Sequence, residues 1–96
     1  MNSIYKYSLK RSARFEREVR KAEKRGLRAE ELDAVVEKLR KDEQLERKHH
    51  DHPLHGEYEG YRECHINPDW LLIYRKYKDK LVLLLSRTGT HSDLFT

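Results

Sequence analysis

The hydrophobic pattern changes its period half-way along this chain of 96 residues. Before residue 43 the apolar side chains recur every three or four positions, which is typical of helices that bury one face. After residue 57 they form three short runs separated by turn residues, which is typical of strands. This order favours an α+β fold in which two helices cover a small sheet.

Two helices are expected in the first half of the chain. The first begins after Ser12, a good N-cap residue, and ends before Gly26. Its apolar face consists of Phe15, Val19 and Ala22. The second spans about residues 29–42, with acidic residues early and basic residues late, as the helix dipole favours. Its apolar stripe consists of Leu32, Val35, Val36 and Leu39.

A sheet is expected to follow a loop over residues 43–56. The strand-like runs cover about residues 58–66, 70–77 and 80–87. Turn residues join them at 67–69 and at 78–79, which predicts an antiparallel meander. An alternating segment at residues 4–8 adds a first strand. The predicted order is β-α-α-β-β-β, in a single domain of residues 1–96.

The turn lengths predict which residues the sheet brings together. A two-residue turn at 78–79 and a three-residue turn at 67–69 set four cross-strand pairs. The pairs are Leu71 with Ser86, Trp70 with Arg87, Ile66 with Trp70, and His65 with Leu71. In this register one end of the sheet collects His65, Asp69, Trp70 and Arg87, with His91 just beyond them.

Such a collection of side chains suits the cleavage of RNA. When a 2′-hydroxyl attacks the neighbouring phosphorus, one group must take its proton and another must protonate the leaving oxygen. Histidine serves either purpose because its reference pKa of about 6.5 lies near neutral pH. Arginine binds phosphate oxygens through a planar fork, and rings such as Trp70 and Phe95 stack on unpaired bases. This scheme requires no metal ion and no cofactor.

The positive charge is concentrated near the N-terminus. The whole chain has a net charge of +4, but between Lys6 and Arg28 ten Lys and Arg residues face three Glu residues, a net charge of +7. This density is expected of a segment that binds a phosphate backbone, and it is equally compatible with a solubilising helix face. The candidate RNA-binding cations are Arg11, Arg14, Lys21, Lys24 and Arg25.

Composition limits what we expect of the core, of disulfides and of the cellular compartment. Only 36% of the residues are hydrophobic and 40% are charged, so we expect a thin core and a partner that stabilises it. A single cysteine, Cys64, excludes an internal disulfide and is expected to be a small buried hydrophobe. The longest apolar run, at 81–85, is too short for a membrane span, and residues 1–3 do not open a signal peptide. We therefore expect a cytoplasmic protein.

Residues 51–95 also contain a series of ordered short motifs. They are Asp51-His52-Pro53-Leu54, Gly60-Tyr61-Arg62, His65 with Pro68-Asp69-Trp70, Leu72-Ile73-Tyr74, Arg87-Thr88-Gly89-Thr90-His91 and Leu94-Phe95. Together they resemble the YafQ branch of the RelE-like toxins, over nearly half of the chain. Several motifs at fitting spacing are far more specific than any one of them. Residues 1–50 match that branch in pattern only.

The resemblance implies a RelE-like fold and a ribosome-dependent mRNA interferase of a bacterial toxin–antitoxin pair. Its partners would be the ribosome with its RNA, mRNA, and a cognate acidic antitoxin. The site residues it implies are His52, His65, Asp69 and His91 for acid–base catalysis, Arg87 for the phosphate, and Trp70 and Phe95 along the mRNA path. We expect His91 to be the general acid and either His65 or Asp69 to be the base.

Two other hypotheses remain open at this stage. One is a non-catalytic module on the same scaffold that binds nucleic acid or an antitoxin. The other is a metal site built from His49, His50, His52 and His55, although no cysteine lies nearby and structural zinc needs four rigid ligands. Single residues also have structural interpretations: Asp69 as a turn cap, Trp70 as core, and Phe95 as a C-terminal anchor.

Overall fold

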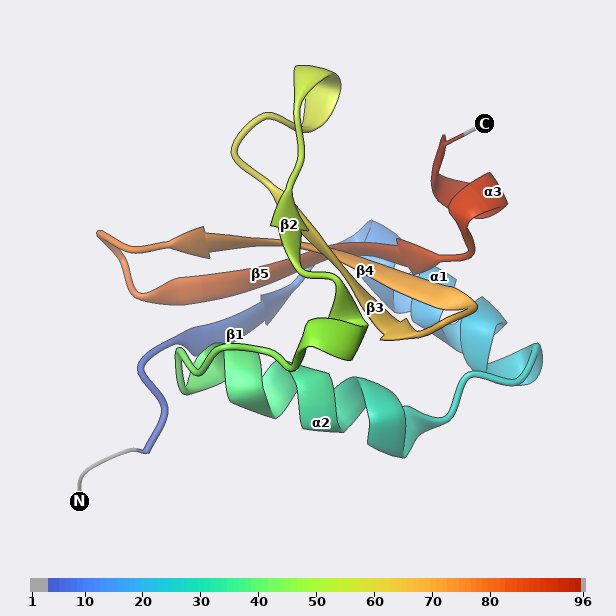
Figure 1. The fold of residues 1–96 in the computed structure, drawn as a ribbon, viewed down its shortest axis with the longest axis horizontal. Helices are drawn as coiled ribbons and strands as arrows, with labels where there is room; N and C mark the ends of the chain where they lie inside the picture. The colour runs from blue at the N-terminus through green and yellow to red at the C-terminus, as the bar shows by residue number, and fades with distance from the viewer. Residues whose placement is uncertain (1–3, 96) are drawn as a thin grey trace.

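The computed structural model describes residues 4–95; the segment 1–3, used above to argue against a signal peptide, lies outside them. Five strands form one sheet in the order β1-β5-β4-β3-β2. The elements are β1 (Ser8–Arg11), α1 (Ala13–Lys24), α2 (Ala29–Arg40), η1 (Arg47–His49), β2 (His52–Pro53), η2 (Gly56–Tyr58), β3 (Arg62–Asn67), β4 (Trp70–Tyr77), β5 (Val82–Gly89) and α3 (His91–Phe95). In Figure 1, α2 lies beneath the sheet, while η2 and α3 rise from its other side.

The predicted α+β class and both predicted helices are confirmed. The side chain of Ser12 accepts a hydrogen bond from the amide of Phe15 at 2.9 Å, which caps α1. Gly26 follows the helix with a φ of +120°, a conformation that glycine adopts at little cost. The four residues of the predicted stripe on α2 are all buried.

The main core lies between the two helices and one face of the sheet. Phe15 and Leu39 from the helices meet Leu72, Tyr74 and Leu83 from the strands, and each of these side chains is less than 2% exposed. Cys64 is fully buried in the same core, as predicted, and burial raises the pKa of its thiol.

A smaller apolar cluster covers the opposite face of the sheet. Leu71 and Ile73 of β4 pack there with Leu94 of α3, and Tyr58 and Tyr61 from the loop before β3 pack against them. These contacts hold α3 and the loop over the sheet. None of the helices within residues 4–95 has the length and apolar character needed to cross a bilayer.

The first strand differs from its predicted position. The segment at 4–8 was expected to be extended, but the amides of Lys6 and Tyr7 donate to the carbonyl of Arg40 at the end of α2, at 2.8 and 3.0 Å. The strand therefore begins only at Ser8, and β1 pairs with β5 in parallel. The sheet is mixed, with an antiparallel meander of β3, β4 and β5 at its centre.

The predicted register between β4 and β5 is wrong. The turn at the end of β4 is longer than two residues, because Tyr77 pairs with Val82 and Leu81 has a φ of +54°. A further irregularity after Ile73 shifts the pairing again, so that Ile73 lies opposite Arg87. The predicted pair of Leu71 with Ser86 is replaced by Leu71 with Gly89. The predicted pair of Trp70 with Arg87 does not form, because Arg87 lies opposite Ile73 instead.

The turn between β3 and β4 confirms one predicted pair and corrects the other. His65 lies opposite Leu71, as expected, but Asn67 rather than Ile66 lies opposite Trp70. The side-chain oxygen of Asn67 accepts hydrogen bonds from the amides of Asp69 and Trp70, which tightens the turn. Strand β2 and helix α3 had no counterpart in the predicted order, and β3 starts at Arg62 because a turn occupies the residues before it.

Candidate functional site

One end of the sheet carries an open hollow of about 520 Å³. Its lining consists of Arg25, His65, Pro68, Asp69, Trp70, Leu71, Thr90, His91 and Ser92. Five of the predicted site residues therefore meet here: Arg25 at the end of α1, His65 from β3, Asp69 and Trp70 from the next turn and strand, and His91 at the start of α3. Sequence reasoning located this convergence although part of its register was wrong.

A small polar network fixes His91 at the hollow. Asp93 accepts a hydrogen bond from the amide of Thr90 at 2.9 Å, and the amide of Asp93 donates to the Thr90 hydroxyl at 3.2 Å. Arg25, at the end of α1, forms an ion pair with Asp93 at 3.0 Å. The amide of Thr90, the hydroxyl of the same residue and Arg25 together hold the pKa of Asp93 below its ordinary value. The network ties α3, and therefore His91, to α1.

His65 lies in a setting that favours its neutral form. Its carbonyl accepts a hydrogen bond from Nδ1 of His49 at 2.6 Å, and the ring of His50 meets its ring edge-on, with centroids 5.3 Å apart. Burial, and then the nearby charge of His50, lower the pKa of His65 from its ordinary value of 6.5. A neutral imidazole at neutral pH is suited to accept a proton.

Trp70 and Asp69 border the hollow in different ways. Trp70 is 7% exposed and belongs to the main core, which confirms its structural interpretation. The guanidinium of Arg25 lies 5.1 Å from the centre of the Trp70 ring. Trp70 is therefore a wall of the hollow and not an open stacking surface. Asp69 is exposed in the turn. Its amide, and not its carboxylate, forms the hydrogen bond with Asn67, donating to the side-chain oxygen of that residue.

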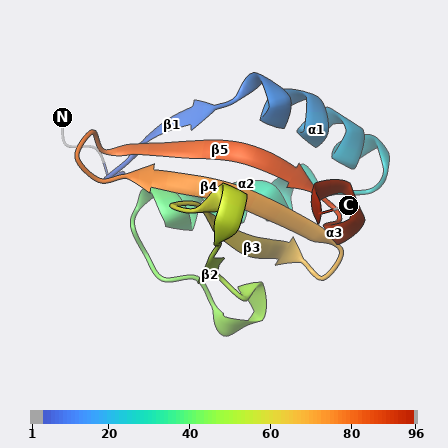
Figure 2. The ribbon, with the colours of Figure 1, turned by 90° about the horizontal axis from the view of Figure 1, so that it is seen from above.

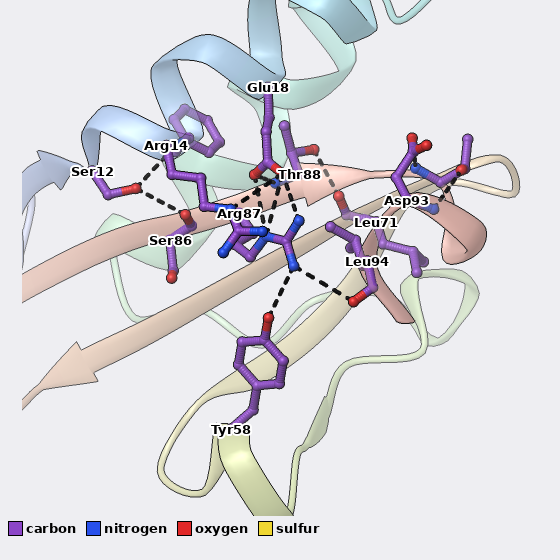
Figure 3. A network of polar contacts seen from close by, with 12 residues as sticks. Ser12, Arg14, Glu18, Tyr58, Leu71, Ser86, Arg87, Thr88, Asp93 and Leu94 are labelled. Carbon is purple, nitrogen blue, oxygen red and sulfur yellow. Dashed lines mark hydrogen bonds and ion pairs between the residues drawn. The ribbon is translucent and has the colours of Figure 1, made fainter. Parts of the chain in front are cut away.

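Arg87 does not line the hollow, because its position on β5 lies further inward than predicted. Its guanidinium donates to the carboxylate of Glu18 at 2.7 Å, to the hydroxyl of Tyr58 at 3.0 Å and to the carbonyl of Leu94 at 3.5 Å (Figure 3). The side chain is only 9% exposed. The hydrogen bonds that Arg87 donates to Glu18 are the main cause that raises the pKa of Arg87.

His52 lies on the same face of the sheet as Arg87. His52 is opposite Glu63, Glu63 opposite Ile73, and Ile73 opposite Arg87, so the four side chains form a row across the strands. Nε2 of His52 contacts the carboxylate of Glu63 at 3.2 Å, and Nδ1 contacts the carbonyl of Pro53 at 3.0 Å. His52 does not line the hollow itself.

The remaining predicted binding residues border the site or lie on α1 and just before it. Phe95 is 39% exposed, and its ring packs against His91 and Tyr58, with centroids 5.1 and 6.3 Å away. Arg11 and Arg14 form ion pairs with Glu16 and Glu18 at 2.9 and 3.8 Å. Lys21 lines a smaller pocket between α1 and the end of β5, and Lys24 is exposed. Arg25 alone among these cations reaches the hollow.

The histidine-rich segment does not assemble a metal site. Among residues 4–95, no three or more His, Cys, Asp or Glu side chains are grouped so that they could hold an ion. His49 and His50 face His65, and His52 faces Glu63. His55 instead contacts Glu59 at 3.6 Å, at the surface.

Three polar residues near the site were not singled out from the sequence. Glu63 lies two residues before His65 on one strand, so the period of two would have placed both on one face. Tyr58 lies in a loop that sequence reasoning assigned to a strand. Glu18 lies within the basic segment, and nothing in the local pattern distinguishes it from the other acidic residues of α1.

Comparison with known proteins gives a consistent result. The family model described as "Bacterial toxin of type II toxin-antitoxin system, YafQ" matches residues 7–96. The mRNA interferase toxin YafQ of Escherichia coli strain K12 is 60% identical over 45 residues, which are 47% of this chain and 47% of that protein. The chain thus spans about half the length of the curated relatives that it matches.

Solved structures extend the similarity to nearly the whole chain. A metal-bound toxin from Helicobacter pylori is 37% identical with a TM-score of 0.87, over 93% of this chain and 99% of that one. The toxin chain of the E. coli DinJ–YafQ toxin–antitoxin complex is 36% identical with a TM-score of 0.84, over 95% and 99%. The fold is therefore shared with these toxins.

Proposed function

The chain belongs to the YafQ family of bacterial type II toxins, and from this premise we propose that it is an endoribonuclease that cuts mRNA on the ribosome. The observation that carries the proposal is the hollow that collects His65, Asp69 and His91 beside Arg25. Two imidazoles, a carboxylate and a guanidinium around one open space can handle both proton transfers and the phosphate charge of RNA cleavage.

In the proposed reaction His65 is the general base. It removes the proton of the 2′-hydroxyl, and its lowered pKa supports this role because the ring is neutral at neutral pH. The 2′-oxygen then attacks the adjacent phosphorus, and the bond from phosphorus to the 5′-oxygen breaks. His91 donates a proton to that leaving oxygen. The products are a 2′,3′-cyclic phosphate and a 5′-hydroxyl, and neither step uses a metal ion.

The other side chains bind and orient in this scheme. Arg25 lies in the hollow and is 51% exposed, so it can reach a phosphate from solvent. Asp69 is the alternative base, since it lines the same hollow as His65. His52, which contacts Glu63, and Arg87 are the two ends of the row of side chains across the strands, and neither lines the hollow. Trp70 forms a wall of the hollow, and Phe95 packs against His91 beside it, so the message would lie along these two rings.

The charge distribution suits the proposed partners. A segment with a net charge of +7 would bind ribosomal RNA phosphates, and this binding should weaken steeply with salt. An acidic antitoxin would compete for the same surface and would neutralise the toxin; that a similar toxin forms a toxin–antitoxin complex, DinJ–YafQ, supports such a partner. A protein that acts on translating ribosomes works in the cytoplasm.

The test is cleavage of a translated message by purified protein, mapped by primer extension on ribosomes and on free RNA. We expect discrete cuts on ribosomes only, and a loss of about 10²–10⁴-fold in rate for His91→Ala and for His65→Ala. His55→Ala is the matched control, because His55 is exposed and does not line the hollow. Cleavage that survives both site substitutions would contradict the proposed chemistry.

Folding of the variants is checked by circular dichroism and thermal unfolding. A wild-type protein that binds ribosomes but leaves the message intact would instead support the non-catalytic module. Metal dependence is tested with a phosphorothioate at the scissile linkage, and we expect the same residual rate with Mg²⁺ and with Mn²⁺. A rate that Mn²⁺ restores selectively would show a catalytic metal.

A further inference from the structure

The edge of β5 is open where β1 ends, and α1 fills this gap. The last residue of β1, Arg11, lies opposite Leu85, and the hydroxyl of Ser12 donates to the carbonyl of Ser86 at 2.8 Å. Beyond that point the chain turns into α1, which runs beside the second half of β5 (Figure 2). The amide of Thr88 therefore has a side chain as its acceptor: Oε1 of Glu18, at 3.3 Å.

The carboxylate of Glu18 also binds the guanidinium of Arg87, the residue before Thr88. Nη2 of Arg87 donates to Oε2 of Glu18 at 2.7 Å, and Nε donates to both carboxylate oxygens at 3.3 and 3.4 Å. This is a two-pronged, charge-assisted contact, the geometry that most restricts a guanidinium. Glu18 is 18% exposed and Arg87 9%, so water screens the pair only weakly.

The remaining side of the Arg87 guanidinium faces the loop before β3 and helix α3. Nη1 of Arg87 donates to the hydroxyl of Tyr58 and to the carbonyl of Leu94, which belong to the loop and the helix that cover this face (Figure 3). Leu94 is three residues after His91 on the same short helix. Arg87 is thus held between α1 on one side and the elements that carry the site on the other.

We infer that Glu18 is a positioning residue: it sets the direction of the Arg87 guanidinium, which in turn holds the Leu94 carbonyl of α3, the helix that begins with His91. The inference rests on the proposed function for its consequence in catalysis. Because Arg87 does not line the hollow, removal of the carboxylate charge should act on turnover, through the placement of His91, and leave the binding of RNA nearly unchanged.

The decisive experiment compares Glu18→Gln with the wild type on ribosomes. We expect kcat to fall about ten- to a hundredfold, because the guanidinium loses its orientation. RNA with a 2′-deoxy scissile nucleotide, which cannot be cut by this route, should bind with nearly unchanged affinity, because Arg87 does not line the hollow. Glu23→Gln, an equal charge change at an exposed site on α1, is the matched control. Glu18→Asp should retain more of the rate than Glu18→Gln.

A double-mutant cycle shows whether Glu18 acts through Arg87. In an Arg87→Met background Glu18→Gln should have no further effect on kcat, whereas a merely structural Glu18 would slow both proteins alike. An equal slowing in both backgrounds, or an unchanged kcat in Glu18→Gln, would overturn the inference.

A second measurement is independent of activity. In nitrogen-15 NMR spectra the Nε–H signal of Arg87 should be sharp and protected in the wild type and should shift and exchange faster in Glu18→Gln. An unchanged signal would refute the positioning role, whether or not Arg87→Met folds. A wild type that leaves mRNA uncut would refute the proposed function alone, because the NMR result would still report on Glu18.

Discussion

A histidine is available as a base over a wider pH range when its surroundings disfavour the charged ring. At His65 burial has this effect and the nearby ring of His50 adds to it. The acidic limb of the pH profile of kcat/KM should therefore have a midpoint below 6.5, the ordinary pKa of the residue.

His50 offers a way to test that cause. In His50→Gln the nearby positive charge is absent, so the pKa of His65 should rise, and the acidic limb should move to higher pH without passing 6.5, since burial remains. NMR titration of the His65 ring protons measures the pKa directly. If the pKa of His65 rises in His50→Gln while the acidic limb of kcat/KM stays in place, the group that sets this limb is not His65.

At the scale of single residues the sequence indicated most of the side chains that meet at the hollow. His65, Asp69 and His91 were predicted to meet, and they do, because the tight turn at Asn67 and the short helix after Gly89 bring them to one end of the sheet. The surroundings of Arg87 could not be predicted. Its partner Glu18 is 69 residues away in the chain, and no local pattern encodes a contact of that range.

Helix α3 is short, and its position depends on close approach at Gly89. A Cβ at this residue would lie 2.9 Å from Cβ of Asp93, nearer than side chains tolerate. Gly89→Ala should push α3 outward and carry His91 with it. We expect a fall in kcat of about tenfold or more, because catalysis is sensitive to displacements of an ångström.

The matched control for this element is Gly26→Ala, which strains the end of α1 through its φ of +120°. It should lower the free energy of unfolding by about 1–2 kcal/mol and leave kcat of the folded protein unchanged. Thermal unfolding and single-turnover cleavage of both variants separate the two effects. If Gly89→Ala lost stability but kept its rate, the proposed dependence on α3 would be wrong.

At the scale of elements, periodicity predicted the helices well and the strand pairing less well. The stripes of α1 and α2 follow from the 3.6-residue repeat alone, because each helix buries one face against the sheet. The register of β5 depends on Leu81, whose positive φ lengthens the turn, and on the irregularity after Ile73. A leucine does not signal such a conformation, so a two-residue turn was the simpler expectation.

At the scale of the whole molecule, a few charged links join segments that are distant in the sequence. Asp42, after α2, contacts Lys76 of β4 at 2.7 Å and Lys6 of the N-terminal segment at 2.9 Å. These hydrogen bonds, first that of Lys76, lower the pKa of Asp42 from 3.8 to about 2. Because the folded-state pKa is depressed, the link stabilises the fold above about pH 4 and is lost as the pH falls toward 2.

Asp42→Asn tests this link without changing the backbone, since Asn also accepts the positive φ of this position. The variant should be less stable than the wild type near pH 6, and its stability should fall less between pH 4 and 2. The side chain is 35% exposed, so solvent will reduce the effect. Denaturant unfolding across this pH range measures the stability of both proteins. If the stability of the variant and that of the wild type fell in parallel with pH, the link would be excluded.

The central claim is that His65 and His91 cut RNA by moving protons to and from the 2′- and 5′-oxygens. The most direct measurement is the chemistry of the cut ends, read by mass spectrometry on a ribosome-bound message. We predict a 2′,3′-cyclic phosphate and a 5′-hydroxyl, and no cleavage when the scissile nucleotide lacks its 2′-hydroxyl. A 5′-phosphate end, or normal cleavage of the 2′-deoxy message, would contradict the claim.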